Sequence, residues 1–236
     1  MIYNDSMKKP GMNSDAAIII PVYNEAEVVA EVVNSVLKHF KYVVCVNDGS
    51  RDASSNEIKK TGAYLIEHPI NMGQGAALQT GIEFARQLPV NYFVTFDADG
   101  QHRIADVYAM LGKIKKDNYD IVLGSRFLGK TIGISRSKRI LLKVAIWFSK
   151  ATTGLLLTDT HNGLRVFNKN IADNIQITQP DMTHASEILE IIADKKYKYT
   201  EVPVTIEYTD YSRSKGQSVV NAVNIGFDTL LRKVSK

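Results

Sequence analysis

Short runs of apolar residues alternate, through the first half of the chain, with segments whose apolar positions recur every three or four residues. The apolar runs are rich in β-branched and aromatic side chains and lie at 16–24, 42–50, 62–68, 91–99 and 119–127. The amphipathic segments lie at 25–40, 52–60, 71–88 and 104–117. Such alternation is typical of parallel strands buried between helices. It predicts an α/β fold with a Rossmann-like, mostly parallel sheet covered by helices on both faces.

The alternation changes after residue 126. We expect a basic amphipathic helix at 136–153, a short hairpin-like piece at 163–167, a helix at 185–195, an extended segment at 199–209 and a final helix from about 217. The chain is therefore predicted to be a loose leader (1–15) followed by one domain (16–236). In that domain 16–126 forms the sheet, and 127–236 adds C-terminal helices and a short β extension.

Composition narrows the choice of partners. With 236 residues and 44% hydrophobic content, the chain is large enough to bury a core. A net charge of +4 suits an anionic partner, but no nucleic-acid-reading motif is present, so we expect no nucleic acid. The single cysteine, Cys45, lies in an apolar run and indicates a reducing, cytoplasmic compartment. No uncharged apolar run approaches the ~18 to 20 residues that span a bilayer.

Polar residues follow the predicted strands where each one ends. In open α/β sheets, ligands bind beyond the carboxyl ends of the strands, so these residues outline a site. They are Asn24 and Glu25, Asn47 and Asp48, 68–71, Asp97 and Asp99, and Ser125 and Arg126.

Asp97 and Asp99 are one residue apart after the fourth run, so an extended backbone would point both carboxylates the same way. At ~4 Å and an effective dielectric near 20, two like charges repel by roughly 4 kcal/mol. Either one carboxyl keeps a proton or a divalent cation lies between them. Gln101 offers a third, neutral oxygen, a set suited to Mg²⁺ or Mn²⁺. The alternative is a pair of solvated turn residues.

Several motifs then resemble one family. "IIIPVYNE", "VNDGSRD", "NMGQGAAL", "FDADGQH" and "GSRF" occur in the order and spacing of family 2 glycosyltransferases with the GT-A fold. Later motifs, "DTHNGLRVF", "HASEIL", "EVPVTIEY" and "RSKGQS", are similar to the dolichyl-phosphate mannose synthase-like branch, so the resemblance covers roughly 16–225. It implies a metal-dependent, inverting enzyme that moves a sugar from a UDP- or GDP-linked donor to a polyprenyl phosphate, or to a cell-surface polysaccharide or glycolipid.

The resemblance also implies roles for residues in the segment 16–126, which would bind the nucleotide-sugar and is called the donor half below. Pro21, Tyr23, Glu25 and Asp48 would hold the base and ribose, Asp97, Ala98, Asp99 and Gln101 the metal and diphosphate, and Arg126 a phosphate. Simpler interpretations are a helix's first turn for Glu25, a turn for Asp48 and a surface salt bridge for Arg126. Asn71, Gly73 and Gly75 are expected to be structural, because the lysine and hydroxyl of a P-loop are missing.

On the acceptor side, the resemblance places Asp159 where a general base would serve a hydroxyl acceptor, with Glu187 as a rival. A phosphate acceptor is already an anionic nucleophile and needs no strong base. The catalytic set is therefore predicted to be Asp99, Arg126 and Asp159. Basic loops would fold over the two phosphates, with these residues: Arg136, Lys138, Arg139, Arg213 and Lys215.

The segment at 137–157 combines apolar and basic residues and predicts a helix lying in a membrane interface, in contact with the inner face. The apolar residues are Ile140, Val144, Trp147, Phe148 and Leu155, and the basic ones are Lys138, Arg139, Lys143 and Lys150. They would equally suit packing under the sheet.

Two other functions stay open. A nucleotidyltransferase shares the architecture but usually carries a glycine-rich basic loop after the first strand, which "IPVYNEAEV" lacks. An inactive nucleotide-sugar-binding homologue would keep the fold without the activity.

Overall fold

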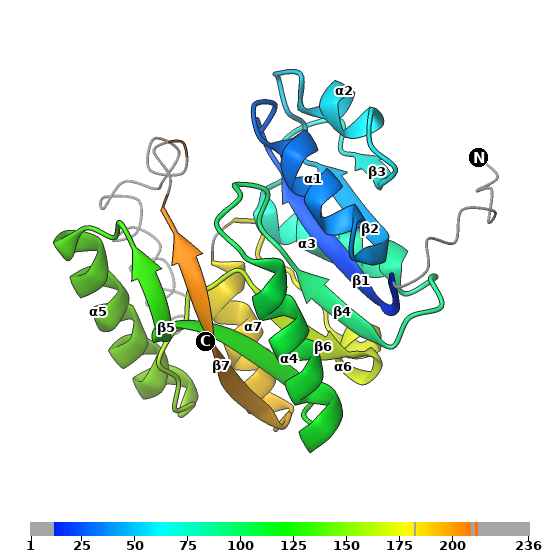
Figure 1. Cartoon of the computed structure of the whole chain (residues 1–236). Helices are drawn as coiled ribbons and strands as arrows, with labels where there is room; N and C mark the ends of the chain where they lie inside the picture. Colours follow the sequence, from blue (N-terminus) through cyan, green and yellow to red (C-terminus); the bar gives the residue numbers. More distant parts are fainter. Residues whose placement is uncertain (1–11, 182, 209–210, 212–236) are drawn as a thin grey trace.

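The computed structural model describes residues 12–181, 183–208 and 211, and its centre is one seven-stranded sheet (Figure 1). The strands are β1 Asn13–Val22, β2 Phe40–Asn47, β3 Tyr64–Glu67, β4 Tyr92–Thr95, β5 Ile121–Ile132, β6 Arg165–Asn168 and β7 Tyr199–Glu207. The helices are α1 Val29–Leu37, α2 Ser54–Lys59, α3 Gln74–Ala85, α4 Ile104–Asp117, α5 Arg136–Thr153, α6 Lys169–Asn174 and α7 His184–Asp194. Up to about residue 126, their order matches the alternation expected from the sequence.

The strand order is β3-β2-β1-β4-β6-β5-β7, and every pairing is parallel except those of β6. Successive residues of β1 face opposite sides, so Ile18 and Ile20 enter one core and Ala17 and Ile19 the other. Helices α1, α2 and α4 cover the first core, and α3, α6 and α7 cover the second. Figure 1 views the sheet with α1 and α4 in front. The predicted sheet covered on both faces is confirmed.

Two boundaries differ from the expectation. β1 begins at Asn13, inside the predicted leader, where the Asp15 carboxylate pairs with the Lys115 amine at 2.7 Å. Residues 1–11 and the helix expected from 217 lie outside the described residues. β5 does not end near residue 126 but continues to Ile132, because β7 runs parallel to it up to the pair Ile132 and Glu207.

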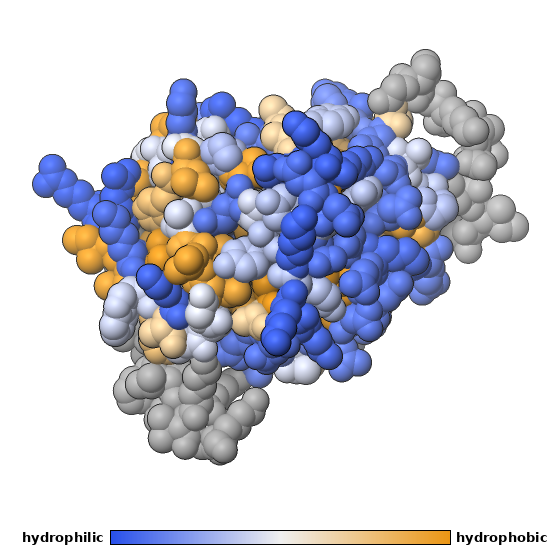
Figure 2. All heavy atoms as spheres, turned by 90° about the horizontal axis from the view of Figure 1, so that it is seen from below, coloured by the Kyte–Doolittle hydropathy of each residue, from blue (hydrophilic) through white to orange (hydrophobic). Residues whose placement is uncertain are grey.

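Helix α5 has the predicted bounds, lies at one side of the molecule (Figure 1) and contacts α7. Its Leu142 is buried, whereas Ile140, Val144 and Trp147 are 64%, 57% and 70% exposed. Seen from below, apolar side chains gather on that side among protruding polar ones (Figure 2). Within the described residues, none of the helices has the length and apolar character needed to cross a membrane.

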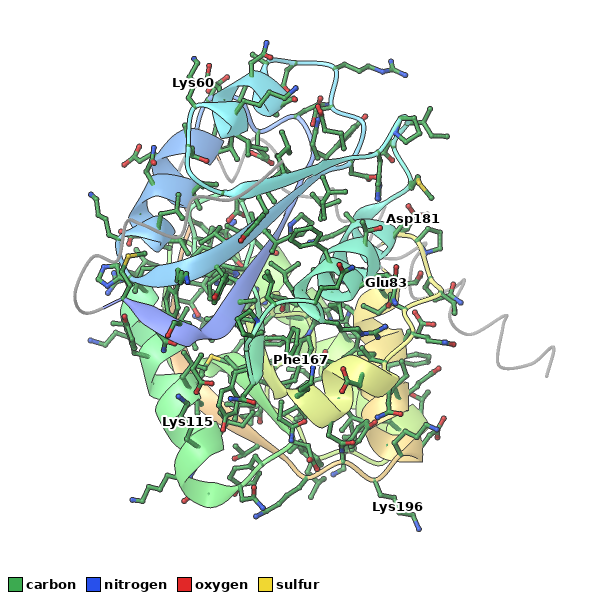
Figure 3. All side chains as sticks on the ribbon, turned by 90° about the vertical axis from the view of Figure 1, so that its right-hand side faces the viewer. Lys60, Glu83, Lys115, Phe167, Asp181 and Lys196 are labelled. Carbon is green, nitrogen blue, oxygen red and sulfur yellow. The ribbon has the colours of Figure 1, made fainter. Side chains whose placement is uncertain are left out.

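The piece expected as a hairpin at 163–167 is instead β6, and that expectation was wrong. β6 pairs antiparallel with β4 on one side and β5 on the other. Its Phe167 ring stacks on Phe93 of β4 with centroids 5.8 Å apart, in the interior seen in Figure 3, while Lys60 and Lys196 point outward. A strand from the second half of the chain thus completes the centre of the sheet.

Candidate active site

The loops after β1 and β2 are joined by hydrogen bonds into one rim. The backbone N–H groups of Asn24 and Glu25 donate to the hydroxyls of Ser50 and Ser54, at 2.9 and 2.7 Å. Glu25 precedes α1, which begins at Val29, so it does not occupy the first turn of a helix. Its carboxylate accepts a hydrogen bond from the Tyr211 hydroxyl. The Glu25 carboxylate on this rim is therefore already in contact with Tyr211, which lies much later in the sequence.

Tyr23 stands on the same rim with 43% of its surface exposed, and Pro21 is half-buried at the end of β1. An exposed ring of this kind offers a flat apolar face to a planar ligand. A contact of either residue with a donor base stays a prediction.

Asp48 lies at the end of β2, but its carboxylate is buried and already engaged. It accepts hydrogen bonds from His68 Nδ1 at 2.7 Å and from the backbone N–H groups of Met72 and Gly73, both at 2.8 Å. Asp48 therefore anchors the 68–73 loop. A contact with the donor ribose stays a prediction for this residue.

The glycines of the 71–75 turn have structural roles in the fold. Gly73 has a φ of 94°, and Gly75 donates its N–H to the Pro180 carbonyl at 2.6 Å. A Cβ at Gly75 would lie 2.0 Å from the Gln179 carbonyl oxygen, so no side chain fits there. The turn thus packs tightly on the 179–180 segment.

Asp97 is held from several directions in the turn after β4. Its carboxylate accepts from His102 Nε2 at 2.9 Å and from Gln74 Nε2 at 3.3 Å. Burial alone would raise the pKa of Asp97, but the hydrogen bond and charge of His102, together with the charge of Arg165, lower it below the usual value. Asp97 is therefore the carboxylate of the turn that stays ionised.

Asp99 behaves in the opposite way. Burial, followed by the negative charge of Asp97, raises the pKa of Asp99 to about 6. Gln101 donates to Asp99 through its backbone N–H at 3.1 Å and its side-chain Nε2 at 2.5 Å. The like-charge conflict expected from the sequence is thus present in the structure.

A divalent cation fits this turn, because it would offset the repulsion between the two carboxylates that raises the pKa of Asp99. The ligands would be the carboxylates of Asp97 and Asp99. Gln101 points its amide nitrogen at Asp99, so its oxygen could bind only after the amide turns over. Ala98 is buried in the core, and its contact with a donor stays a prediction. Across the part of the chain that the structure describes, no three His, Cys, Asp or Glu side chains form a metal-binding group.

Arg126 does not stand at the end of a strand, and this expectation needs correction. Because β5 continues past it, its side chain is only 7% exposed. Nε donates to the Asp159 carboxylate at 2.6 Å, Nη1 to the Tyr208 hydroxyl at 2.8 Å and Nη2 to the His161 carbonyl at 2.6 Å. Burial would lower the pKa of Arg126, but Asp159 and Tyr208 raise it above its usual value. Arg126 therefore joins β5 to the 159–161 loop.

Asp159 is the buried partner of that pair. Its side chain has no exposed surface, and it also accepts the Arg126 backbone N–H at 3.0 Å. The Glu201 carboxylate holds the same loop through the backbone N–H groups of Thr158 and Asp159, at 2.8 and 3.0 Å. In this structure Asp159 is placed as a structural anion rather than as a base open to a substrate.

Glu187, the rival base, is engaged as well. Its carboxylate accepts from the backbone and hydroxyl of Thr178 and from the backbone N–H of Gln179, at 2.5 to 3.0 Å. Of the predicted acceptor and lid residues, Arg139 is exposed on α5, whereas Arg213 and Lys215 lie outside the described residues.

Sequence reasoning missed a buried cation at the site. Arg165 is 2% exposed, and burial lowers its pKa to about 10, against the opposing charges of Asp97 and Asp159. Among the described residues, its Nη1 has no hydrogen-bond partner. His161 and His184 lie nearby, and burial lowers the pKa of each to about 4. The place of Arg165 depends on how β6 pairs with its neighbouring strands, and the local periodicity of the sequence does not reveal that pairing.

Comparison with known proteins identifies the family. A sequence model of glycosyl transferase family 2 matches residues 17–176. The chain is 30% identical over 243 residues to a UDP-N-acetylglucosamine–dolichyl-phosphate N-acetylglucosaminyltransferase of Methanococcus voltae, covering 93% of this chain and 96% of that protein. It is 27% identical over 228 residues to an undecaprenyl-phosphate 4-deoxy-4-formamido-L-arabinose transferase of Pseudomonas fluorescens, covering 91% and 63%.

Among solved structures, the glucosyl-3-phosphoglycerate synthase of Mycobacterium tuberculosis, in complex with Mn²⁺ and UDP-glucose, has the same fold. The TM-score is 0.68 at 13% identity, with 94% of this chain and 78% of that chain covered. Together with the family match over 17–176, the mostly parallel seven-stranded sheet shows that this chain is a GT-A-fold glycosyltransferase that belongs to family 2.

Proposed function

We propose that this enzyme transfers a sugar from a nucleotide-sugar, UDP- or GDP-linked, to a polyprenyl phosphate, with Mg²⁺ or Mn²⁺ bound at the turn of Asp97 and Asp99. The observation that carries the proposal is the pair of carboxylates in one turn: Asp97 is held by His102 and Gln74, and Asp99 has its pKa raised to about 6 by burial and by the charge of Asp97. Such a pair of carboxylates suits a divalent cation that also binds the diphosphate of a donor.

The donor would lie along the rim formed by the ends of β1, β2 and β4. Tyr23 offers its exposed ring to the base, and Glu25 offers acceptor oxygens to ribose hydroxyls. A divalent cation bound there would supply Lewis-acid neutralisation of the charge on the departing nucleoside diphosphate. Asp97, held by His102 and Gln74, would keep one ligand fixed in place.

A phosphate acceptor agrees with the state of the two predicted bases. Asp159 is paired with Arg126, and Glu187 is occupied by the 178–179 backbone. A sugar hydroxyl would need one of these carboxylates to be released, whereas a phosphate monoester brings its own anionic oxygen.

The relatives from Methanococcus voltae and Pseudomonas fluorescens are named for dolichyl phosphate and undecaprenyl phosphate, and both names support a lipid-linked phosphate. A polysaccharide or glycolipid acceptor is the alternative. Inversion at the sugar carbon follows from the family resemblance.

Such an acceptor lies in a membrane, and α5 supports contact with one. The exposed Ile140, Val144 and Trp147 recur at intervals of four and three residues, so they form one stripe along the helix. Exposed cations flank it, namely Arg136, Arg139, Lys143 and Lys150. An apolar stripe beside basic residues suits the interface of a bilayer with anionic lipids, which would be the inner face of the membrane.

Thermal unfolding with UDP, GDP and their sugars, each with and without Mn²⁺, tests the donor. A ligand of the native state raises the melting temperature with concentration, so one nucleotide with Mn²⁺ should stabilise the chain most. Transfer to polyprenyl phosphate is then measured by mass spectrometry of the lipid product. Nucleotide binding without product would indicate an inactive homologue. Release of pyrophosphate from a nucleoside triphosphate and a sugar phosphate would instead indicate a nucleotidyltransferase.

A further inference from the structure

The pairing of β4 with β6 continues beyond the last hydrogen-bonded residues. It reaches the turn of Asp97 and Asp99, called the acidic turn below. The register runs from Tyr92 opposite Asn168 to Thr95 opposite Arg165. Each step moves one residue forward along β4 and one residue back along β6, so two further steps bring Asp97 opposite Gly163. In antiparallel pairs, directly opposed residues have their Cβ atoms about 4.5–5.5 Å apart and side chains on the same face. Asp97 therefore faces a position without a side chain.

The Asp97 carboxylate occupies the space that a side chain at Gly163 would fill. A Cβ built on Gly163 would lie 2.2 Å from Asp97 Oδ2, 2.5 Å from Oδ1 and 2.6 Å from Cγ. Gly163 is not among the glycines with positive φ, so its backbone conformation is open to alanine. What requires glycine at this position is the space taken by the carboxylate.

Other groups also contact Asp97, whose side chain is 29% exposed. The Thr95 hydroxyl donates to the Gly163 carbonyl at 2.5 Å and fixes the backbone on which the carboxylate rests. His102 and Gln74 donate to its two oxygens. Arg165 is two residues from Gly163 along the strand, hence on the same face, and supplies a buried positive charge. A carboxylate displaced from Gly163 would therefore move away from these donors and this charge.

We propose that Gly163 is a positioning residue of the metal site: its missing side chain lets the Asp97 carboxylate lie where it can bind the cation. This inference rests on the proposed function for the metal, and it extends the site to the second half of the chain. Nothing in the motif of the acidic turn itself contains this requirement, since Gly163 follows Asp97 by 66 positions in the sequence.

Direct Mn²⁺ binding tests the inference without any turnover. The fraction of free Mn²⁺ is measured by electron paramagnetic resonance for the wild-type chain, Gly163→Ala and Gly112→Ala. Gly112 lies in α4 and a Cβ there meets nothing within 4 Å, so it is a matched control for the same chemical change. Loss of a ligand-orienting neighbour typically weakens metal affinity by about 10- to 100-fold, which is the effect expected for Gly163→Ala. Gly112→Ala should bind like the wild type.

A metal-free measurement separates the inference from the proposed function. Gly163→Ala should lower the melting temperature in the wild-type background, but it should have no effect in an Asp97→Ala background, where the colliding carboxylate is absent. Wild-type affinity together with wild-type stability in Gly163→Ala would overturn the inference. A melting temperature lowered equally in both backgrounds would also overturn it. A wild-type chain that binds no Mn²⁺ would overturn the proposed metal site and the role of Gly163 in it, while the metal-free cycle would still decide the steric contact.

Discussion

Asp97 and Asp99 share one turn, yet the structure shifts the pKa values of their carboxyl groups in opposite directions. Asp97 is surrounded by His102, Gln74 and the buried Arg165, and its pKa is lowered. Asp99 faces the negative charge of Asp97 from a buried position, and its pKa is raised to about 6. The Asp97 carboxylate thus contributes to the stability of the fold. The Asp99 carboxylate is repelled by a neighbouring negative charge, and a bound cation would remove that repulsion.

Neutralising the two aspartates should therefore have opposite effects on the metal-free protein. A carboxyl with a raised pKa is destabilising once the pH rises above that pKa, because the folded state then loses a proton that it binds more tightly than the unfolded state. At pH 7.5, Asp99→Asn should stabilise the fold by about 1–2 kcal/mol, or roughly 2–8 °C in melting temperature. Asp97→Asn should lower the melting temperature, since it leaves Arg165 with less compensating charge.

Calorimetry with chelator present measures both variants, and both should also lose Mn²⁺ binding. Equal shifts of the same sign would contradict the division of roles between the two aspartates.

The pair of Arg126 and Asp159 is predicted to matter for stability. Breaking a buried ion pair leaves an uncompensated charge and typically costs about 3–5 kcal/mol. Asp159→Asn should therefore reduce the free energy of unfolding in urea by that order. Asp117→Asn, which breaks the exposed pair with Lys113 at 2.7 Å, is the control and should cause no measurable change. Full stability in Asp159→Asn together with lost turnover would restore Asp159 as a catalytic base.

Acid should destabilise the fold through His184. Burial lowers the pKa of His184 to about 4, and the ring is held by the Asp181 carbonyl at 2.7 Å. A histidine with a lowered pKa contributes stability above its unfolded value near 6.5, and that stability is lost as the pH falls towards 4, because the unfolded chain takes up the proton first. The loss should approach roughly 3 kcal/mol.

The measurement is the free energy of unfolding against pH for the wild type and His184→Gln, with exposed His39→Gln as control. The slope between pH 6.5 and 4 should flatten in the first variant only. An unchanged slope in His184→Gln would refute the assignment.

Trp147 gives a direct test of membrane contact, because it is the only tryptophan of the chain. It is 70% exposed on α5, so its fluorescence should shift to shorter wavelength when the ring enters an apolar interface. Anionic vesicles should cause the shift, and salt should weaken it, because Lys143 and its basic neighbours attract the lipid headgroups. Lys143→Glu should reduce the shift. An emission maximum that does not move with anionic vesicles would rule out contact through this helix.

Much of the fold could be predicted from the sequence, because helices and buried strands leave local periodicity. The bounds of α4 and α5 were found as expected, at 104–117 and 136–153. β6 was misjudged because its four residues pair with strands that are distant in the sequence, and a short apolar run does not reveal its partner. The same distance hid Gly163 and Arg165.

The roles predicted for the site residues stay predictions, and the structure adds the contacts around them that the sequence does not contain. Asp97 and Asp99 could be paired from their spacing alone. Arg126 and Asp159 were predicted to be functional because their types suit phosphate binding and catalysis. In the structure the two side chains form a buried ion pair with each other. Burial of an ion pair depends on the length of β5 and the path of the 159–161 loop, and neither is visible in a motif.

The position of β6 also decides how the protein can be dissected. A fragment cut after residue 126 would keep the motifs for nucleotide and metal but would lose the strand that fills the gap between β4 and β5. It would expose the backbone edges of two apolar strands, a template for aggregation. Expressing the two halves together from separate genes, rather than truncating the gene, is the way to ask whether the donor half can assemble without a covalent link.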